Sequence, residues 1–285
     1  MAKLIDGKVI AKKISRESAQ RVKQLKAKGF SPKLAVVLVG DDPASLTYVR
    51  QKEKLAREVG VDFVLHTLPI SIRPEVIIAE LNDIQQDRNL SGLIIQLPLP
   101  EKLYSPKVLN NIQPEVDVDF LSEASMGKVV MGTNEIEPPT PGSILTILRE
   151  LKVKLAGKHI TVVGMGALVG KPLSMLLEHE GASVTTCNSQ TKDIPKKCRQ
   201  ADIIVSCVGK KDLIRGSMVA PGAIVIDAGF SFFKGKSYGD VNFEEVKKVA
   251  GFLTPTPGGV GPITVALLLQ NTVYSAEQKL KHLDY

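Results

Sequence analysis

The chain has 285 residues, of which 44% are apolar and 24% charged, as expected for a globular protein with one large or two modest domains. No apolar run approaches the about 20 residues that span a bilayer, and the first 18 residues lack the apolar core of a secretory signal, so we expect a cytoplasmic protein without a membrane partner. The net charge of +7 raises the question of nucleic acid, but the lysines are dispersed and no nucleic-acid module is present, which favours small anionic ligands.

The first half of the chain alternates helical patterns with short apolar runs. A helix is predicted to open near Asp6, a good N-cap, and to turn Val9, Ile10, Ile14 and Val22 towards a core. The strands and helices predicted after it are 34–40 (strand), 45–59 (helix), 61–68 (strand), 74 to about 86 (helix) and 92–100 (strand). Apolar strands separated by helices indicate a parallel sheet covered on both faces.

The second half repeats this pattern after the proline-rich stretch EIEPPTPGS (135–143), which is typical of a domain hinge. Its predicted strands are 159–164, 183–189, 201–209 and 223–230, with a helix after the first strand and a last helix from about residue 261. The predicted fold class is therefore α/β, with two α/β domains and a ligand cleft between them.

Three cysteines and four scattered histidines show no spacing that is typical of a disulfide framework, a zinc knuckle or a catalytic metal. The sequence therefore predicts no metal held by the protein.

Tyr48 and Lys52 stand four residues apart on the predicted helix 45–59, so their side chains share one helix face. A lysine on a charged helix is usually an exposed surface residue. This segment alone does not separate that interpretation from a catalytic one.

The turn VVGMGALVG places Gly164, Gly166 and Gly170 between a buried strand and a helix. Glycines permit a tight turn and close backbone approach, and the helix N-terminus attracts a pyrophosphate, so the order strand, glycines, helix indicates a dinucleotide site. The next strand ends in TTCNSQT, with neither the acid that binds an NAD ribose nor an arginine for a 2′-phosphate. Lys171 and Lys192 are nearby in sequence, and the choice between NAD and NADP stays open.

Several motifs occur in an order that matches one family: YVRQK, GLIIQLPLP, DVD, PPTPGS, VGMGALVGKP, VTTCNSQT, PGAIVIDAG, GDV and TPTPGGVGPITVALLLQNT. Along nearly its whole length the chain resembles the bifunctional methylenetetrahydrofolate dehydrogenase/methenyltetrahydrofolate cyclohydrolase family. The resemblance implies oxidation of 5,10-methylenetetrahydrofolate with NAD(P)⁺ and hydrolysis of the methenyl product to 10-formyltetrahydrofolate. It also implies three segments: a folate-binding catalytic domain (1–138), a Rossmann-like NAD(P)-binding domain (139–263) and a C-terminal helix (264–285) that packs back on the first domain.

The resemblance assigns catalytic roles to Lys52, to Tyr48 beside it and to Gln96, which hydrogen-bonds the lysine. A lysine is a poor base at neutral pH, and desolvation or a cationic substrate would lower its pKa. Asp119 matches the aspartate that holds the pterin ring, although Phe120 follows where the family usually has glycine. A solvated turn and a Mg²⁺ site are the alternatives for DVD.

The remaining residues implied by the resemblance bind substrate or cofactor. The substrate-binding set is Tyr48, Asp119, Gly259 and Pro262. The cofactor-binding set is Thr140, Gly164, Met165, Gly166, Val169, Gly170, Asn188, Ser189, Gly258 and Gly259. A structural turn that leads into the last helix is the alternative for residues 258–262.

The cofactor implied by the family is NADP, with NAD as an alternative. Met165 and Gly166 replace the usual arginine and serine of the glycine turn, and Asn188, Ser189 and Gln190 replace a basic segment, so we expect a weakened preference for NADP. Pro139 replaces a cysteine without chemical consequence. The partners implied are tetrahydrofolate derivatives and a second copy in a homodimer. A cyclohydrolase without hydride transfer and a non-catalytic dinucleotide sensor are the alternative functions.

Overall fold

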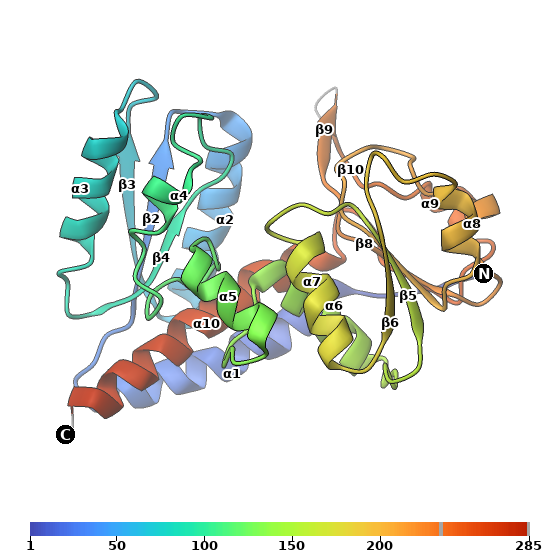
Figure 1. Cartoon of the computed structure of the whole chain (residues 1–285). Helices are drawn as coiled ribbons and strands as arrows, with labels where there is room; N and C mark the ends of the chain where they lie inside the picture. The colour runs from blue at the N-terminus through green and yellow to red at the C-terminus, as the bar shows by residue number, and fades with distance from the viewer. Residues whose placement is uncertain (234–235, 284–285) are drawn as a thin grey trace. The chain divides into compact units, whose positions relative to one another are not determined.

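The structure, a computed structural model, describes residues 1–233 and 236–283 and divides into two compact units (Figure 1). The three-stranded unit comprises residues 12–139 and 265–285, and the six-stranded unit comprises residues 1–11 and 140–264. Both sheets are parallel and carry helices, so the predicted fold class of two α/β domains is confirmed. The ligand cleft between them stays a prediction.

The sheet of the three-stranded unit has the order β3-β2-β4. Its strands are β2 (Lys33–Val39), β3 (Asp62–Leu68) and β4 (Leu90–Ile95). Its shorter helices are α2 (Pro43–Val59), α3 (Pro74–Ile84), α4 (Pro106–Leu109) and α5 (Glu123–Met131). The central strand β2 and its neighbour β4 are almost wholly buried, as their continuous apolar runs predict.

Two long helices, α1 (Gly7–Ala27) and α10 (Val260–Leu283), contribute to the core of the three-stranded unit. Val22 of α1 and Leu268 and Val273 of α10 belong to the same buried cluster. The guanidinium of Arg21 donates two hydrogen bonds, of 2.8 and 2.6 Å, to the carboxylate of Glu277. Residues 284–285, the end of the predicted C-terminal segment, lie outside the described residues.

The sheet of the six-stranded unit has the order β1-β11-β8-β7-β5-β6. Its strands are β1 (Lys3–Leu4), β5 (His159–Val163), β6 (Ser183–Cys187), β7 (Ile203–Ser206), β8 (Ile224–Asp227) and β11 (Phe252–Leu253). A separate antiparallel pair is formed by β9 (Ser231–Phe233) and β10 (Lys236–Tyr238). The helices are α6 (Pro139–Glu150), α7 (Gly170–His179), α8 (Ile194–Arg199), α9 (Phe243–Val246) and the 3₁₀ turn η1 (Gly216–Met218).

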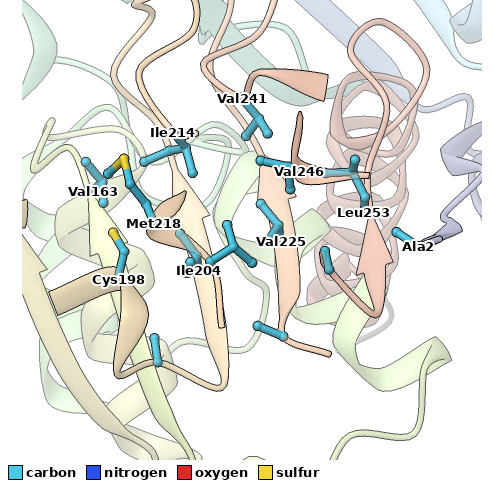
Figure 2. Packing of buried hydrophobic residues seen from close by; sticks show 14 of the residues in the cluster. Ala2, Val163, Cys198, Ile204, Ile214, Met218, Val225, Val241, Val246 and Leu253 are labelled. Carbon is cyan, nitrogen blue, oxygen red and sulfur yellow. The ribbon is translucent and has the colours of Figure 1, made fainter. Parts of the chain in front are cut away.

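One face of this sheet carries a buried apolar cluster that includes Ile204 of β7, Val225 of β8 and Leu253 of β11 (Figure 2). Ala2 also belongs to it, because β1 pairs with β11 in parallel register. The expected first segment, 1–138, therefore differs from the observed unit at its start: residues 1–11 associate with the six-stranded sheet. A two-residue strand gives too short a pattern to predict its partner.

Three local expectations are corrected. Strand β4 ends at Ile95 rather than continuing to residue 100, because Pro98 and Pro100 cannot donate to a strand ladder. The boundary between the two units, at residues 139 and 140, falls inside the predicted hinge 135–143, but the segment is helical from Pro139, a residue type that the first turn of a helix tolerates. Val9 is 65% exposed, whereas Ile14 is buried; five residues rotate a side chain by about 140° around the helix.

No helix within the described ranges is both long and apolar enough to cross a membrane.

Candidate active site

Helix α2 presents Lys52 at the carboxyl end of the three-stranded sheet. The carboxylate of Asp42 caps the helix by accepting a 2.7 Å hydrogen bond from Ser45 N, and Pro43 occupies its first turn. Lys52 Nζ donates a hydrogen bond of 2.9 Å to Oε1 of Gln96. The two residues, 44 positions apart in the chain, are thus brought together as predicted.

Gln96 directly follows β4, where parallel α/β sheets bind ligands. Its backbone N–H donates to Val37 O at 2.8 Å, and its side-chain Nε2 donates to Leu97 O at 2.7 Å. The side chain is buried, and the bond from Nε2 fixes which end of the amide faces the lysine. Gln96 therefore offers its carbonyl oxygen to Lys52 as an acceptor.

Burial lowers the pKa of Lys52 below its ordinary value, and the negative charge of Asp119 opposes this shift. Burial also raises the pKa of Asp119 to about 6, against the effect of Lys52 and with a contribution from Asp117. The amine and the carboxylate therefore interact electrostatically in a poorly solvated site. Lys52 is not the freely solvated surface lysine that its helix alone would suggest.

The two aspartates of DVD have different surroundings. The buried carboxylate of Asp117 accepts hydrogen bonds from Leu121 N at 2.9 Å, Ser122 N at 2.9 Å and Ser122 Oγ at 2.6 Å. These bonds hold the loop that follows Asp119. Among the described residues, no group of three or more His, Cys, Asp and Glu side chains gathers as metal ligands.

Phe120 has a φ of 57°, in the left-handed region, although its side chain is buried. This conformation is unusual for a large residue and explains why glycine would suit the position. Phe120 thus occupies a backbone conformation that glycine adopts more readily, and Asp119 interacts electrostatically with Lys52 in spite of it.

Tyr48 lies one helical turn before Lys52 on α2 and is half-buried. Burial raises the pKa of its phenol to about 12, so the hydroxyl keeps its proton at neutral pH. Tyr48 can therefore donate a hydrogen bond where Lys52 exchanges a proton.

The glycine turn joins β5 to α7 in the six-stranded unit. Gly164 has a φ of 103°, and a Cβ there would lie 2.6 Å from Cys207 O. A Cβ on Gly170 would overlap the carbonyl oxygen of Gly164, whereas Gly166 faces open space. The backbone thus forms a cradle at the start of α7, where N–H groups and the helix dipole favour a pyrophosphate.

Two further predicted residues, Asn188 and Ser189, follow β6, the strand paired with β5. Both are exposed, and Asn188 Oδ1 accepts a 2.9 Å hydrogen bond from Gln190 N. Met165 and Val169 lie within the glycine turn, and Thr140 lies in the first turn of α6.

The turn at residues 254–259 also belongs to the six-stranded unit. Gly258 has a φ of 108°, and its carbonyl oxygen accepts a 3.0 Å hydrogen bond from Gly7 N. A Cβ on Gly7 would overlap Gly259 O, so the N-terminal segment supports this loop. Pro262 lies in the first turn of α10. The role of Gly7 was missed, because a single glycine near a helix start carries no distinctive signal.

The observed geometry defines a class of protein: a two-unit α/β protein with a dinucleotide cradle in one unit and a desolvated lysine at the sheet end of the other. Residues 5–119 match the catalytic-domain model, and residues 138–280 the NAD(P)-binding-domain model, of the tetrahydrofolate dehydrogenase/cyclohydrolase family.

Relatives match over almost the full chain. The bifunctional protein FolD of Halalkalibacterium halodurans is 43% identical over 277 residues, which cover 97% of this chain and 99% of the relative. That of Cupriavidus necator is 45% identical over 97% of this chain and 98% of the relative. The structure of the bifunctional FolD methylenetetrahydrofolate dehydrogenase/cyclohydrolase of Campylobacter jejuni superposes with a TM-score of 0.95 at 38% identity, covering 98% and 99% of the two chains.

The chain belongs to the tetrahydrofolate dehydrogenase/cyclohydrolase family. The predicted family membership and the predicted pair of enzyme activities are thereby confirmed, and neither a cyclohydrolase-only enzyme nor a non-catalytic sensor is favoured.

Proposed function

We propose that this chain oxidises 5,10-methylenetetrahydrofolate to the methenyl form with NADP⁺ and hydrolyses that product to 10-formyltetrahydrofolate, with Lys52 as the proton-transfer group. The observation that carries the assignment of Lys52 is its 2.9 Å hydrogen bond to Gln96 in a site where burial lowers the lysine pKa. A lowered pKa supplies the neutral amine that general base catalysis requires.

The hydrolysis balances with one amine as proton carrier. Lys52 takes a proton from water as the water oxygen bonds to the methenyl carbon. The bond from that carbon to N5 then breaks, N5 receives the proton from Lys52, and the hydroxyl proton of the adduct leaves to solvent. The sum is one formyl group on N10 and one proton released, which matches the loss of the substrate's positive charge.

Gln96 and Tyr48 support this exchange. The Oε1 acceptor of Gln96 directs the amine in both of its protonation states, because a neutral and a charged amine both donate. Tyr48, whose pKa is raised to about 12, stays a donor for the developing oxygen. Asp119 is proposed to bind the amino and ring N–H groups of the pterin, and Gly259 and Pro262 to contact the substrate.

NADP⁺, when bound, accepts a hydride from the methylene carbon. The cradle of Gly164, Gly166 and Gly170 suits its pyrophosphate, since these three residues carry no side chains and lead into the N-terminus of α7. The proposed cofactor contacts are Thr140, Met165, Val169, Asn188, Ser189, Gly258 and Gly259 in addition to the cradle. The structure of the Trypanosoma brucei relative, 34% identical, is described as a complex with NADP.

The test follows both reactions in the purified chain. Methylenetetrahydrofolate is supplied with NADP⁺ or NAD⁺ while reduced nucleotide is measured, and decay of added methenyltetrahydrofolate is followed separately. Catalysis of both steps supports the proposal. Methenyl decay without nucleotide reduction by either cofactor would contradict the dehydrogenase half, and decay no faster than in buffer would contradict the cyclohydrolase half.

A homodimer and a cytoplasmic location are also proposed from the family. Light scattering on the purified chain tests the first, because a monomer mass would contradict it. Fractionation of the source cells tests the second.

A further inference from the structure

Two buried carboxylates of the six-stranded unit take no part in the chemistry described above. Asp227 ends β8 and is 4% exposed, and Asp240 follows β10 and is 0% exposed. Burying a carboxylate is costly unless its oxygens accept strong hydrogen bonds. These two must therefore be held by donors that the fold supplies.

Each carboxylate is bonded to a different loop at the carboxyl end of the sheet. Asp227 accepts hydrogen bonds of 3.0 Å from the backbone N–H groups of Gly229, Asp240 and Val241. Asp227 thus fixes the backbone of the residue that carries the second carboxylate.

Asp240 in turn holds the loop after β7. It accepts 2.7 Å hydrogen bonds from the hydroxyl of Ser206 and from the backbone N–H groups of Val208 and Lys210. Three hydrogen bonds accepted by one carboxylate hold both the start and the end of residues 206–210, since bonds to carboxylate acceptors are the stronger class.

The chain leaves room for both carboxylates through two glycines. A Cβ on Gly229 would overlap the carboxylate of Asp240, and a Cβ on Gly239 would overlap that of Asp227. The carboxylates are therefore packed directly against the opposite backbone, and neither loop can shift without losing its acceptor.

The loop that Asp240 holds, residues 206–210, packs against the glycine turn at Gly164. A Cβ on Gly164 would lie 2.6 Å from Cys207 O and 3.0 Å from a methyl group of Val208. Cys207 N donates to Val163 O at 2.8 Å, and its thiol donates to Gly164 O at 3.1 Å. A displacement of residues 207–208 would therefore act directly on the Gly164 turn.

We propose that Asp240 is a positioning residue for dinucleotide binding: it locks residues 206–210 against the Gly164 turn, and Asp227 holds it in place. This inference rests on the proposed function, because the turn must bind the cofactor. It assigns a role to the DAG and GDV motifs, for which the sequence pattern alone predicts none.

The test measures NADP⁺ binding and both reactions in Asp240→Asn. The amide keeps the shape of the carboxylate but loses its charge and aims an NH₂ group at N–H donors. Because hydrogen bonds to carboxylate acceptors are stronger than neutral ones, we expect the dissociation constant and the KM of NADP⁺ to rise about tenfold or more. Hydrolysis of added methenyltetrahydrofolate without nucleotide should stay within about twofold, since no bond to Asp240 reaches Lys52.

Two further variants separate positioning from loss of folding. Ser206→Ala removes one donor to Asp240 and is expected to raise the NADP⁺ dissociation constant about threefold, as one modest hydrogen bond implies. Val246→Ala leaves a cavity beside α9, removes none of the hydrogen bonds to Asp240, and should lower the melting temperature without changing that constant.

The outcomes are distinct. Unchanged NADP⁺ binding in folded Asp240→Asn would overturn the inference, as would a parallel loss of both reactions in Asp240→Asn and Val246→Ala. If Asp240→Asn does not fold, Ser206→Ala replaces it in the test. An unchanged NADP⁺ dissociation constant in folded Ser206→Ala would then overturn the inference. A wild-type chain that neither binds nor reduces NADP⁺ would instead contradict the proposed function.

Discussion

Lys52 Nζ and Gln96 Oε1 lie 2.9 Å apart, and this hydrogen bond joins the middle of helix α2 to the residue that follows strand β4. It fixes the amine at the carboxyl end of the sheet, in a site where burial lowers its pKa. A lysine in such a place can exchange protons near neutral pH, which an exposed lysine cannot do efficiently.

A negative charge in place of Gln96 should shift the pH dependence of hydrolysis. In Gln96→Glu the carboxylate stabilises the ammonium form of Lys52 and raises its pKa, so the neutral amine appears only at higher pH. The pH profile of methenyl hydrolysis is therefore expected to move to the alkaline side by about one unit or more. A profile that stays in place would mean that Lys52 does not set it.

Asp119 should reduce the stability of the folded protein at neutral pH. Its folded pKa of about 6 lies above that of an unfolded aspartate, so the folded state binds the proton more tightly and stability falls as pH rises through this interval. At pH 7 the free energy of unfolding of Asp119→Asn is expected to exceed that of the wild type by on the order of 2 kcal/mol, after allowance for partial solvation. The variant should therefore unfold at a higher temperature.

Thermal unfolding at two pH values checks the sign. The stabilisation by Asp119→Asn should shrink towards pH 4, where the native carboxyl is also protonated, while folate binding is weakened at pH 7. If Asp119→Asn were less stable than the wild type at pH 7, burial of the Asp119 carboxylate could not be destabilising the folded protein.

Phe120 tests how the loop beside Asp119 tolerates a large side chain at φ 57°. Phe120→Ala loses the buried ring and keeps the unfavourable backbone, at a cost of about 3–5 kcal/mol. Phe120→Gly loses the same ring but relieves the left-handed strain of about 1–2 kcal/mol. Chemical denaturation is therefore expected to show the glycine variant as the more stable of the two, and the reverse order would contradict the strain.

A substitution at Gln190 should increase the preference for NADP⁺ over NAD⁺. Gln190, exposed after β6, stands where the family usually has a basic residue. Gln190→Arg is expected to raise the ratio of kcat/KM for NADP⁺ to that for NAD⁺ about tenfold, because a charge-assisted bond to the 2′-phosphate becomes available. Gln200→Arg adds the same charge beyond α8 and serves as the control; an equal change in both variants would indicate a general effect of charge.

The sequence predicted the two α/β units, the strand-turn-helix order at Gly164 and the approach of Gln96 to Lys52. Long apolar runs and glycine spacing carry the first two features locally, whereas the approach of Gln96 to Lys52 followed only from the resemblance to the family. The pairing of β1 with β11 could not be predicted, because Lys3 and Leu4 form too short a pattern and their partner lies about 250 residues away. The hydrogen bonds that the carboxylates of Asp227 and Asp240 accept likewise depend on loop geometry that no local pattern specifies.

Methenyl hydrolysis by Lys52→Met, beside Lys54→Met as an exposed control on the same helix, tests the central role of Lys52 most directly. Loss of a proton-transfer group typically costs about 10²- to 10⁴-fold in rate, so we expect a fall of that size in Lys52→Met and a wild-type rate in Lys54→Met. Wild-type hydrolysis by a folded Lys52→Met protein would contradict the account.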